Sequence, residues 1–481
     1  MNINKQTQEH IRWGLPPDKI KQLEQHLVHF FEQFRPFFQT ETHDTSDYGL
    51  RYLSGLLRME AKRNMAEIGR KTGTTPQNMQ HFMSNSPWSG TQLVSGVQDR
   101  LKQHPEFCSG ALLALDESVD EKAGGYSAGA RRQHNGRLGK VEMSQVGVFL
   151  SLVTPRVNTW IDGELYLPAC WFQEAYAERR AQVGLPQERT FQTKPELGWQ
   201  MIQRAQANGV QFAAVVMDDL YGRNTVLRQR LHQAGIEYYG DIPANTLVYL
   251  DKPQVTYPLT KRGTPSKRAT IVAQQRVEVQ SLLHDSSLER AQLTLRPNER
   301  GLLCAEFARR RVWLVYAGQP RQEWLLIRQD EQRVTYVLSN APPETPLKTM
   351  AWRKTHRYFI ERSNQDAKGE SGWDEFQATK YRAWEHQLAL TILASWFIAE
   401  IRLDWMAHYE RDPELLAQYG VEVLPLLSVS NVRELLRAAM PLPQLSPLEA
   451  ADLVIEHLIN RTRSRKSRLQ RQLWKQRVPE T

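Results

Sequence analysis

Two apolar runs that each end in an aspartate constrain the fold of this chain more than any other feature. The run ALLALD ends at Asp116, and the run AAVVMD ends at Asp218. Short apolar runs of this kind are typical of strands buried inside an α/β sheet. Functional groups collect just beyond the strand ends of such sheets, so we expect the two carboxylates to lie close together.

The segments around these runs predict a mixed α/β core over residues 106–235. SQVGVFLSLVTP and TWIDGELYLP predict a pair of strands with a turn between them. Two amphipathic helices are expected at about 170–184 and 193–208, followed by a second buried strand within 209–222. The resulting order is β-β-β-α-α-β, which is typical of an α/β domain.

Two carboxylates at one edge of a sheet can hold divalent cations. Mg²⁺ prefers oxygen ligands and is usually held by one or two carboxylates together with substrate phosphates. Two such ions suit an in-line displacement at phosphorus, because they activate the attacking oxygen and stabilise the leaving one. The formal net charge of +9 favours a polyanionic partner, with nucleic acid first and a membrane surface second.

The helical stretch at 355–373 offers a third acid. Arg357, Glu361 and Lys368 stand at helical positions i, i+4 and i+11, which places them on one face. A carboxylate flanked by cations suits metal-bound phosphate chemistry, because the cations can contact the phosphates. A surface helix with salt bridges is the alternative, and the spacing alone favours it.

The first 105 residues are expected to be helical, with a helix-turn-helix pattern at 65–85. Gly73 ends the first helix, Thr75 can cap the second, and Pro76 suits its first position. The second helix turns Met79, Phe82 and Met83 inward and presents four polar side chains that could enter a major groove: Gln77, Asn78, Gln80 and His81. An ordinary helical hairpin explains this pattern equally well.

The remaining regions carry weaker signals. Residues 236–350 read as short antiparallel strands with a basic loop at 261–268, and the chain is helical again from 351. The apolar stretch 388–401 is too short to span a membrane and predicts a buried core helix. The end at 461–477 holds eight Lys or Arg and no acid, so it either contacts phosphate or is a solvated terminus. The cysteines are expected to be buried, unpaired thiols: Cys108, Cys170 and Cys304.

Taken together, three of these segments resemble the DDE transposases of bacterial insertion sequences, and more narrowly the DDE-superfamily endonuclease group. The first segment is the aspartate-ended strand followed by Lys122, then SAGARRQHNGRLGKV at 127–141, then Gln145 and VGVFLSLV. The second is Asp218 followed by Tyr221 and Gly222. The third is a helix with Ile360, Glu361, Ala367, Lys368, Gly369 and Glu370. Order and spacing agree from about residue 106 to residue 400.

The resemblance implies an α/β fold with an RNase H-like mixed-sheet catalytic core. It implies a helical DNA-binding region with a helix-turn-helix at 1–105, a core in two parts at 106–235 and 351–410, a β-rich insertion at 236–350 and a helical basic C-terminal region at 411–481. The metal-binding catalytic triad would be Asp116, Asp218 and Glu361, with Asp219 a weaker candidate for the second acid. The cofactor would be two Mg²⁺ ions, for which Mn²⁺ can substitute.

This chain departs from the family pattern at several positions. The tyrosine of the Y-R-E-K signature of related transposases would fall at Lys354, so the signature is partial and a tyrosine–phosphate contact is in doubt. The chain also has His134 where the family usually has tyrosine, Ser144 where cysteine is usual and Trp373 where leucine is usual. The acids that follow Asp116 are predicted to be bystanders: Glu117, Asp120 and Glu121.

The expected function is that of a bacterial, cytoplasmic, nucleoid-associated transposase. It would act as a homodimer on double-stranded DNA, bind the terminal inverted repeats of its element, cleave their ends and join the 3′-hydroxyl groups to target DNA. Arg357 and Lys368 would position DNA phosphates, as would Lys122, Arg131 and Lys140. One alternative is a catalytically inactive or domesticated transposase-derived DNA-binding protein. A metal-independent sugar hydrolase with two carboxylates is the other, and the basic flanks disfavour it.

Overall fold

The computed structural model of the chain describes residues 3–122, 124–135, 139–258, 264, 269–272, 275–298, 301–330, 333–443 and 446–477. The contacts divide it into two compact units, Met1–Met440 and Pro441–Thr481. The second unit contains the long helix α17 (Pro447–Arg477). The five-part division expected from the sequence stays a prediction, and its basic loop at 261–268 lies outside the described residues apart from Thr264.

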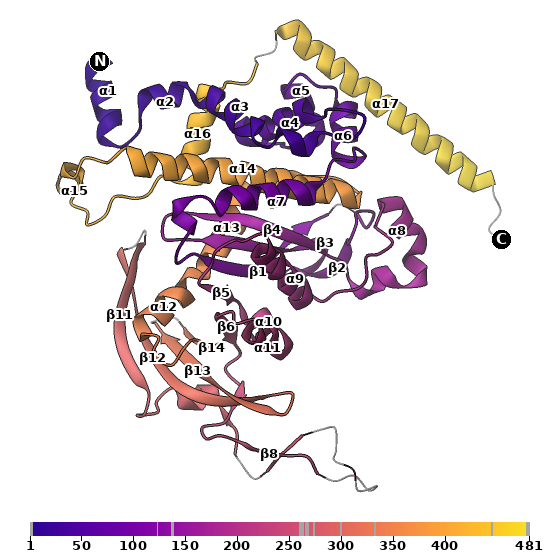
Figure 1. Cartoon of the computed structure of the whole chain (residues 1–481). Coiled ribbons are helices and arrows are strands. Elements are labelled where there is room, and N and C mark those ends of the chain that lie inside the picture. The colour runs from indigo at the N-terminus through magenta and orange to yellow at the C-terminus, as the bar shows by residue number, and fades with distance from the viewer. Residues whose placement is uncertain are drawn as a thin grey trace. The chain divides into compact units, whose positions relative to one another are not determined.

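The first unit is a mixed α/β structure built on a ten-stranded sheet (Figure 1). The strand order is β11-β12-β13-β14-β6-β5-β1-β3-β2, and β4 pairs with β3. The strands are β1 (Leu112–Glu121), β2 (Arg131–Asn135), β3 (Lys140–Val153), β4 (Asn158–Tyr166), β5 (Ala214–Met217), β6 (Tyr238–Ile242), β11 (Glu289–Asn298), β12 (Gly301–Tyr316), β13 (Gln319–Gln329) and β14 (Val334–Ser339). Four short strands form two small sheets: β7 (Leu247–Val248) with β10 (Val277–Glu278), and β8 (Gln254–Thr256) with β9 (Thr270–Val272).

Strand β1 lies at the centre of the predicted α/β core. It runs parallel to β5, with Leu115 opposite Met217, and antiparallel to β3. The side chains of its first four residues are fully buried, as an apolar run between two neighbouring strands predicts. The predicted pair of β3 and β4 is confirmed as antiparallel. The expectation that the first strand ends at Asp116 is wrong, because β3 keeps pairing with β1 as far as Glu121.

The β-rich region extends the same sheet. Strands β11 to β14 pair antiparallel in sequence order, as expected, and β14 then pairs with β6 through Val337 and Asp241. Apolar residues of this region form a cluster of their own, which includes Val279, Val312 and Leu325. The helix α12 (Leu347–His356) follows and packs on β5, β11 and β12.

Helices occupy most of the first hundred residues: α1 (Ile3–Arg12), α2 (Pro17–Lys21), α3 (Leu23–Glu32), α4 (Ser46–Arg58), α5 (Met65–Lys71), α6 (Pro76–Ser84) and α7 (Gly90–Leu101). The predicted helix, turn and helix are present as α5 and α6. Gly73 lies between them with φ +74°, and the Thr75 side chain accepts a hydrogen bond from the backbone N–H of Asn78 at 3.2 Å. Met79, Phe82 and Met83 are buried as expected.

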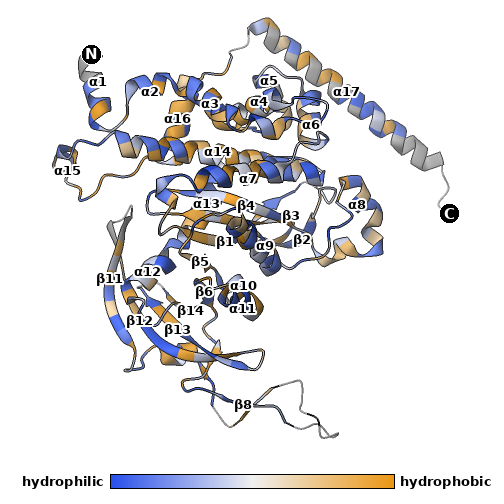
Figure 2. Cartoon of the chain, viewed as in Figure 1, coloured by the Kyte–Doolittle hydropathy of each residue, from blue (hydrophilic) through white to orange (hydrophobic). Residues whose placement is uncertain are grey.

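The stretch 388–401 lies within α14 (Tyr381–His408), where it forms the predicted buried helix. The helix packs against α4, α6, α7 and β4, and in Figure 1 α4 and α6 lie on one side of it and α7 and the sheet on the other. Apolar residues recur along its length (Figure 2), so it joins the helical layer to the sheet. Among the described helices, none is long and apolar enough to cross a membrane.

The other α-helices of the chain are α8 (Ala177–Val183), α9 (Lys194–Ala207), α10 (Asp219–Gly222), α11 (Thr225–Gln233), α13 (Tyr358–Gly369), α15 (Glu414–Tyr419) and α16 (Val429–Ala439). Of the two helices predicted after β4, the first is shorter than expected, because two 3₁₀ turns at Ala169–Phe172 and Glu174–Tyr176 replace its beginning. The prediction of three buried thiols is wrong for Cys108 and Cys304, which are exposed. Cys108 follows a 3₁₀ turn before β1, and Cys304 lies on β12.

Candidate active site

The structure brings Asp116 and Asp218 to adjacent positions on two parallel strands. Each follows one member of the register pair formed by Leu115 and Met217. Asp218 is the N-cap of α10, where its carboxylate accepts hydrogen bonds from the backbone N–H groups of Leu220 at 3.0 Å and Tyr221 at 3.3 Å. The side-chain position of Asp218 is therefore fixed by the first turn of a helix.

The two carboxyl groups disfavour each other's ionised form. Burial raises the pKa of Asp116 to about 8, with the negative charge of Asp218 as the next cause. Burial also raises the pKa of Asp218 to about 6, and the next cause there is the charge of Glu117. Asp218 loses its proton first, so the charge of Asp218 raises the pKa of Asp116, whereas the charge of Glu117 raises the pKa of Asp218. Such a pair is stabilised by any cation that enters between the two groups.

The guanidinium of Arg357 is the cation already present at this site. It forms an ion pair with Glu361, lies 3.6 Å from a carboxylate oxygen of Asp241, and its charge lowers the pKa of both Asp116 and Asp218. Burial lowers the pKa of Arg357, but the charges of Asp241, Glu361 and Asp116 outweigh it and leave the pKa above its ordinary value. Arg357 therefore partly neutralises a group of carboxylates.

Glu361 lies in the first turn of α13, which packs against β1, β3 and β4. Its side chain is 48% exposed, and its carboxylate is engaged by Arg357. Within the described part of the chain, no three His, Cys, Asp or Glu side chains converge closely enough to hold one metal ion. The structure thus places Asp116 and Asp218 at adjacent positions after a register pair of two neighbouring strands. It places Glu361 beside Arg357, whose charge lowers the pKa of both aspartates.

Lys368 fastens α13 to the strand that carries Asp116. Its ammonium lies 2.9 Å from Asp120 and donates a hydrogen bond to the backbone oxygen of Val119 at 2.7 Å. Asp120 is 4% exposed and also accepts a hydrogen bond from the indole N–H of Trp373 at 2.6 Å. Asp120 therefore anchors two side chains of the site, and its predicted lack of a catalytic role stays a prediction.

Two further lysines near the site face the protein interior. Lys122 is buried, donates to the backbone oxygen of Phe376 at 3.3 Å, and has a pKa lowered by burial. Lys354, at the position where a tyrosine was expected, is buried and paired with Asp241; burial lowers its pKa. Contacts of Lys122 and Lys368 with DNA stay predictions, and each would require the ammonium to leave its present partner.

Glu117 and Tyr221 belong to the site, although the sequence did not single out Glu117. One oxygen of Glu117 lies 2.9 Å from the ammonium of Lys194. Its other oxygen and the Tyr221 hydroxyl are both buried, and a hydrogen bond between the Glu117 and Tyr221 side chains is among the causes that raise the pKa of Tyr221. Burial, followed by the charges of Glu117 and Asp116, raises the pKa of Tyr221 well above its ordinary value. The charge of Glu117 contributes to the raised pKa of Asp218, and its predicted lack of a catalytic role stays a prediction.

The other residues predicted to contact DNA lie on exposed surfaces. Arg131 and Lys140 lie on the β2–β3 hairpin, where Lys140 is 2.7 Å from Glu142. The exposed face of α6 carries Gln77, Asn78, Gln80 and His81. Their contacts with DNA stay predictions.

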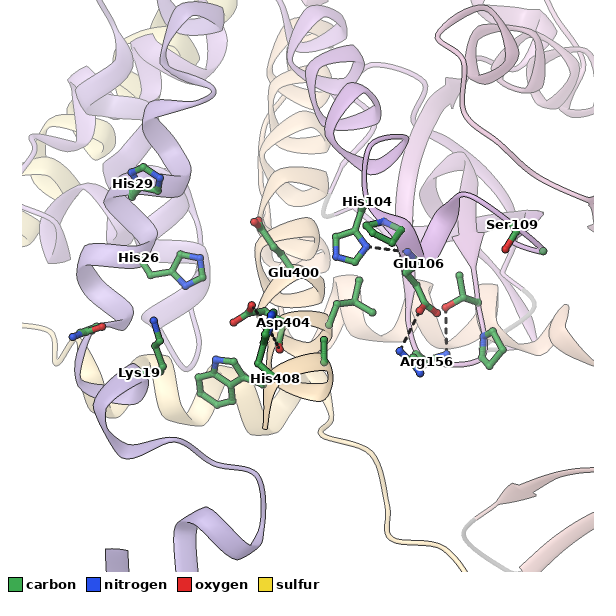
Figure 3. Close-up of a pocket in the computed structure, with 18 of the residues that line it drawn as sticks. Lys19, His26, His29, His104, Glu106, Ser109, Arg156, Glu400, Asp404 and His408 are labelled. Atoms are coloured by element: carbon green, nitrogen blue, oxygen red, sulfur yellow. Dashed lines mark hydrogen bonds and ion pairs between the residues drawn. The ribbon is translucent and has the colours of Figure 1, made fainter. Parts of the chain in front are cut away.

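A large pocket lies at the opposite end of the central strand. Its volume is about 1090 Å³, and its lining includes His26 from α3, Asp404 from α14, Gly110 before β1 and Thr154 after β3 (Figure 3). Gly110 and Thr154 mark the end of the strand pair where β1 begins, whereas Asp218 follows the carboxyl end of β5. Because open α/β sheets bind ligands at the carboxyl ends of their strands, this pocket is not assigned to the chemistry of the carboxylates.

Comparison with known proteins points to one family. The family described as DDE superfamily endonuclease matches residues 29–299 of the chain. The matched range includes Asp116 and Asp218 and ends before Glu361. The chain is also similar to a protein of Microchaete diplosiphon named as a probable transposase for insertion sequence element IS701. The two are 23% identical over 373 residues, which is 74% of this chain and 83% of that protein.

Proposed function

Because the chain belongs to the family of DDE superfamily endonucleases, we propose that it is a DNA transposase. It binds the ends of its element, cleaves DNA phosphodiester bonds there and joins the resulting 3′-hydroxyl groups to target DNA. The similarity to a protein named as a probable insertion-sequence transposase supports this proposal. The mixed sheet, with β1 between an antiparallel β3 and a parallel β5, is compatible with an RNase H-like core.

The observation that carries the proposal is the position of Asp116 and Asp218 side by side, directly after the last register pair of the parallel strands β1 and β5. Both carboxyl groups have raised pKa values, and the neighbouring Glu117 adds a negative charge that contributes to both shifts. An all-oxygen donor set with mutual repulsion fits hard divalent cations such as Mg²⁺. We assign Asp116, Asp218 and Glu361 as the residues that hold two Mg²⁺ ions. When bound, the ions supply charge stabilisation to the attacking and leaving oxygens at phosphorus.

Arg357 has a defined part in this proposal. In the free protein its guanidinium pairs with Glu361 and neutralises the aspartates. A DNA phosphate competes well for this guanidinium, because Arg forms two parallel hydrogen bonds to phosphate oxygens. Once Arg357 turns to DNA, the carboxylate of Glu361 is released toward Asp116 and Asp218. Binding of the correct DNA would therefore complete the set of three acids.

The remaining contacts bring the DNA to the acids. We assign the exposed face of α6 to a major groove of the element end, with Gln77, Asn78, Gln80 and His81 reading base edges. Arg131 and Lys140 on the β2–β3 hairpin would contact phosphates, as would Lys122 and Lys368 after rearrangement. Two element ends must be joined in one reaction, so we expect a homodimer on paired double-stranded ends.

The test is a cleavage assay on duplex DNA that carries the element end, with Mg²⁺ present. The variants Asp116→Asn, Asp218→Asn and Glu361→Gln each remove one charge, and Glu121→Gln is a matched control at the exposed end of β1. Each of the three should lower cleavage more than about a hundredfold, which exceeds the usual effect of losing an outer-sphere partner. The control should cleave like the wild type. Full cleavage by any of the three variants would remove that residue from the site.

A DNA-binding measurement accompanies the assay. The three variants should still bind the element end, because their charges are not needed for the groove contacts of α6. A wild-type protein that binds the element end tightly and never cleaves it would favour the transposase-derived DNA-binding protein without catalysis.

A further inference from the structure

A second, smaller pocket lies beside α11, the second helix after Asp218. It has a volume of about 300 Å³ and lies between α11, the chain after β6 and the end of β12. Three arginines and two tyrosines line it, and no acidic side chain is among its described lining residues: Arg223, Arg228, Arg276, Tyr249 and Tyr316. This composition is that of a site for an anion.

Arg228 is the unusual member of this group. Its residue is only 2% exposed, yet its Nε and Nη1 atoms have no hydrogen-bond partner among the described residues. Its guanidinium lies 5.5 Å from the centre of the Tyr316 ring. Buried guanidinium donors are almost always satisfied, because an unpaired buried charge is costly. The two unpartnered donors therefore point to a ligand of this pocket.

The surrounding charges do not balance Arg228. Glu323 is a fully buried carboxylate beside the same tyrosine, and one of its oxygens accepts hydrogen bonds from Arg321 and from the Tyr316 hydroxyl. Among the described residues, its other oxygen forms no hydrogen bond with Arg228. One carboxylate thus stands against two guanidinium groups, and an anion in the pocket would compensate the excess.

The beginning of α11 adds a further attraction for an anion. Thr225, the first residue of this nine-residue helix, lines the pocket. A helix N-terminus carries a partial positive charge and unpaired backbone N–H groups, both of which favour phosphate. Arg223 stands just before the helix and is 3.4 Å from Asp219 at the surface. The helix end and the three arginines therefore favour the same kind of ligand.

We propose that this pocket binds a backbone phosphate of the DNA strand, other than the phosphate held at Asp116 and Asp218. The inference rests on the proposed function, because it takes the substrate to be DNA. The segment from Asp218 to Arg228 is two consecutive helices. Gly222 packs so tightly on β6 that a Cβ atom there would lie 2.0 Å from the backbone oxygen of Asp241. The same short segment thus holds the carboxylate and the arginines, so a phosphate bound here sets the register of the strand.

The first test measures DNA binding against salt concentration, in EDTA so that no cleavage occurs. The probe is the duplex element end, and the variants are Arg228→Met and the matched control Arg230→Met, on the same helix but outside the pocket lining. Arg228→Met should lower the affinity about tenfold and reduce the slope of log K against log salt by about 1, as the loss of one phosphate contact predicts. Arg230→Met should change neither. An unchanged slope and affinity for Arg228→Met would overturn the proposal.

A second test locates the phosphate and does not depend on a buried substitution. Methylphosphonate linkages neutralise one phosphate of the duplex at a time. The wild-type protein should lose affinity at one linkage near the cleavage position, and Arg276→Gln, which changes an exposed residue, should become insensitive at that linkage. If every linkage has the same effect on Arg276→Gln as on the wild type, the pocket does not contact the strand.

A test with free phosphate ligands distinguishes a pocket that binds DNA from one that binds a small phosphate compound. If thymidine monophosphate or inorganic phosphate raises the melting temperature of the wild type but not of Arg228→Met, while DNA binding is alike in both, the pocket serves a small molecule and the DNA assignment is wrong. These binding results stand apart from catalysis. Cleavage by the wild type with normal DNA binding by Arg228→Met would defeat this inference alone. If the wild type does not cleave DNA but Arg228→Met binds DNA more weakly than the wild type, only the proposed cleavage chemistry is wrong.

Discussion

Arg357 forms an ion pair with Glu361 across one turn of helix, and its charge also lowers the pKa of Asp116. One guanidinium therefore partly neutralises both Glu361 on the helix and Asp116 on the central strand. Asp241 shares the same cation at 3.6 Å. The free protein thus carries its own counter-ion where the proposed metal ions would bind, which couples metal binding to the position of Arg357.

This coupling predicts that Arg357→Ala binds metal more tightly in the absence of DNA. Removing the cation leaves the carboxylates without a positive neighbour, so the affinity for Mn²⁺ near pH 9, where protons no longer compete, should rise about three- to tenfold. Titration calorimetry measures it. Arg362→Ala is the control, because Arg362 lies on the same helix and pairs with Asp366 instead. Equal or weaker Mn²⁺ binding by Arg357→Ala would contradict the role of Arg357 as counter-ion.

The affinity for metal should depend steeply on pH. Asp218 has a pKa of about 6 and Asp116 of about 8, so below pH 6 both are mostly protonated and above pH 8 both are ionised. Metal ligands must be deprotonated, so Mn²⁺ affinity should rise between these limits and binding should release up to two protons. Calorimetry in buffers of different ionisation enthalpy counts the protons. A flat affinity from pH 6 to pH 9 would show that the two acids do not titrate against the metal.

The stability of the metal-free protein should also depend on Asp116. Its folded pKa lies above its unfolded value, so the stabilisation is fully present below the unfolded pKa and is lost as pH rises toward 8. In EDTA near pH 9, the free energy of unfolding of Asp116→Asn should be about 2 kcal/mol higher than that of the wild type. This difference is smaller than the full pKa shift of Asp116 implies, because the side chain is only half-buried. Near pH 4 the two proteins should agree. Urea unfolding at both pH values measures the difference, and equal stability near pH 9 would contradict the burial of this charge.

The ion pair between Lys368 and Asp120 should stabilise the folded structure of the DNA-free protein. Breaking it leaves a buried carboxylate without its cation, so Lys368→Met should lower the free energy of unfolding by about 3 kcal/mol. The double variant Lys368→Met, Asp120→Asn should recover part of that loss. In EDTA the salt slope of DNA binding should fall by about 1, because Lys368 is proposed to contact a phosphate after rearrangement. A Lys368→Met variant with the slope of the wild type would show that Lys368 has only the structural role.

The pairing of the two aspartates could be predicted from the sequence because two apolar runs of strand length end in the same residue type. The helix, turn and helix at 65–85 could also be predicted, because they depend on residues close together in the sequence. Gly73 ends the first helix, and Thr75 and Pro76 begin the second. The end of β1 was placed too early because the continued pairing depends on β3, whose partner residues lie tens of positions away. Hydrophobic periodicity does not show which strand pairs beyond a polar residue.

Contacts between distant segments account for most of what the sequence could not show. Lys368 and Asp120 are 248 positions apart, and only the packing of α13 on β1 brings them together. Arg228 lies on a helix of ordinary amphipathic pattern, and its burial is seen only once α11 meets Tyr316 of β12. Glu117 was predicted to be a bystander, yet its negative charge contributes to the raised pKa values of Asp218 and Tyr221.

The central claim is that Asp116 and Asp218 contact the catalytic metal ions, and a change of ligand tests it most directly. Thiolates bind Mg²⁺ poorly and accept softer ions, so Asp116→Cys and Asp218→Cys should lose cleavage of the element end in Mg²⁺ and regain a measurable part of it in Mn²⁺. The two asparagine variants should stay inactive in both metals. If either cysteine variant cleaves as well in Mg²⁺ as the wild type, or if Mn²⁺ restores the asparagine and cysteine variants alike, that aspartate is not a metal ligand.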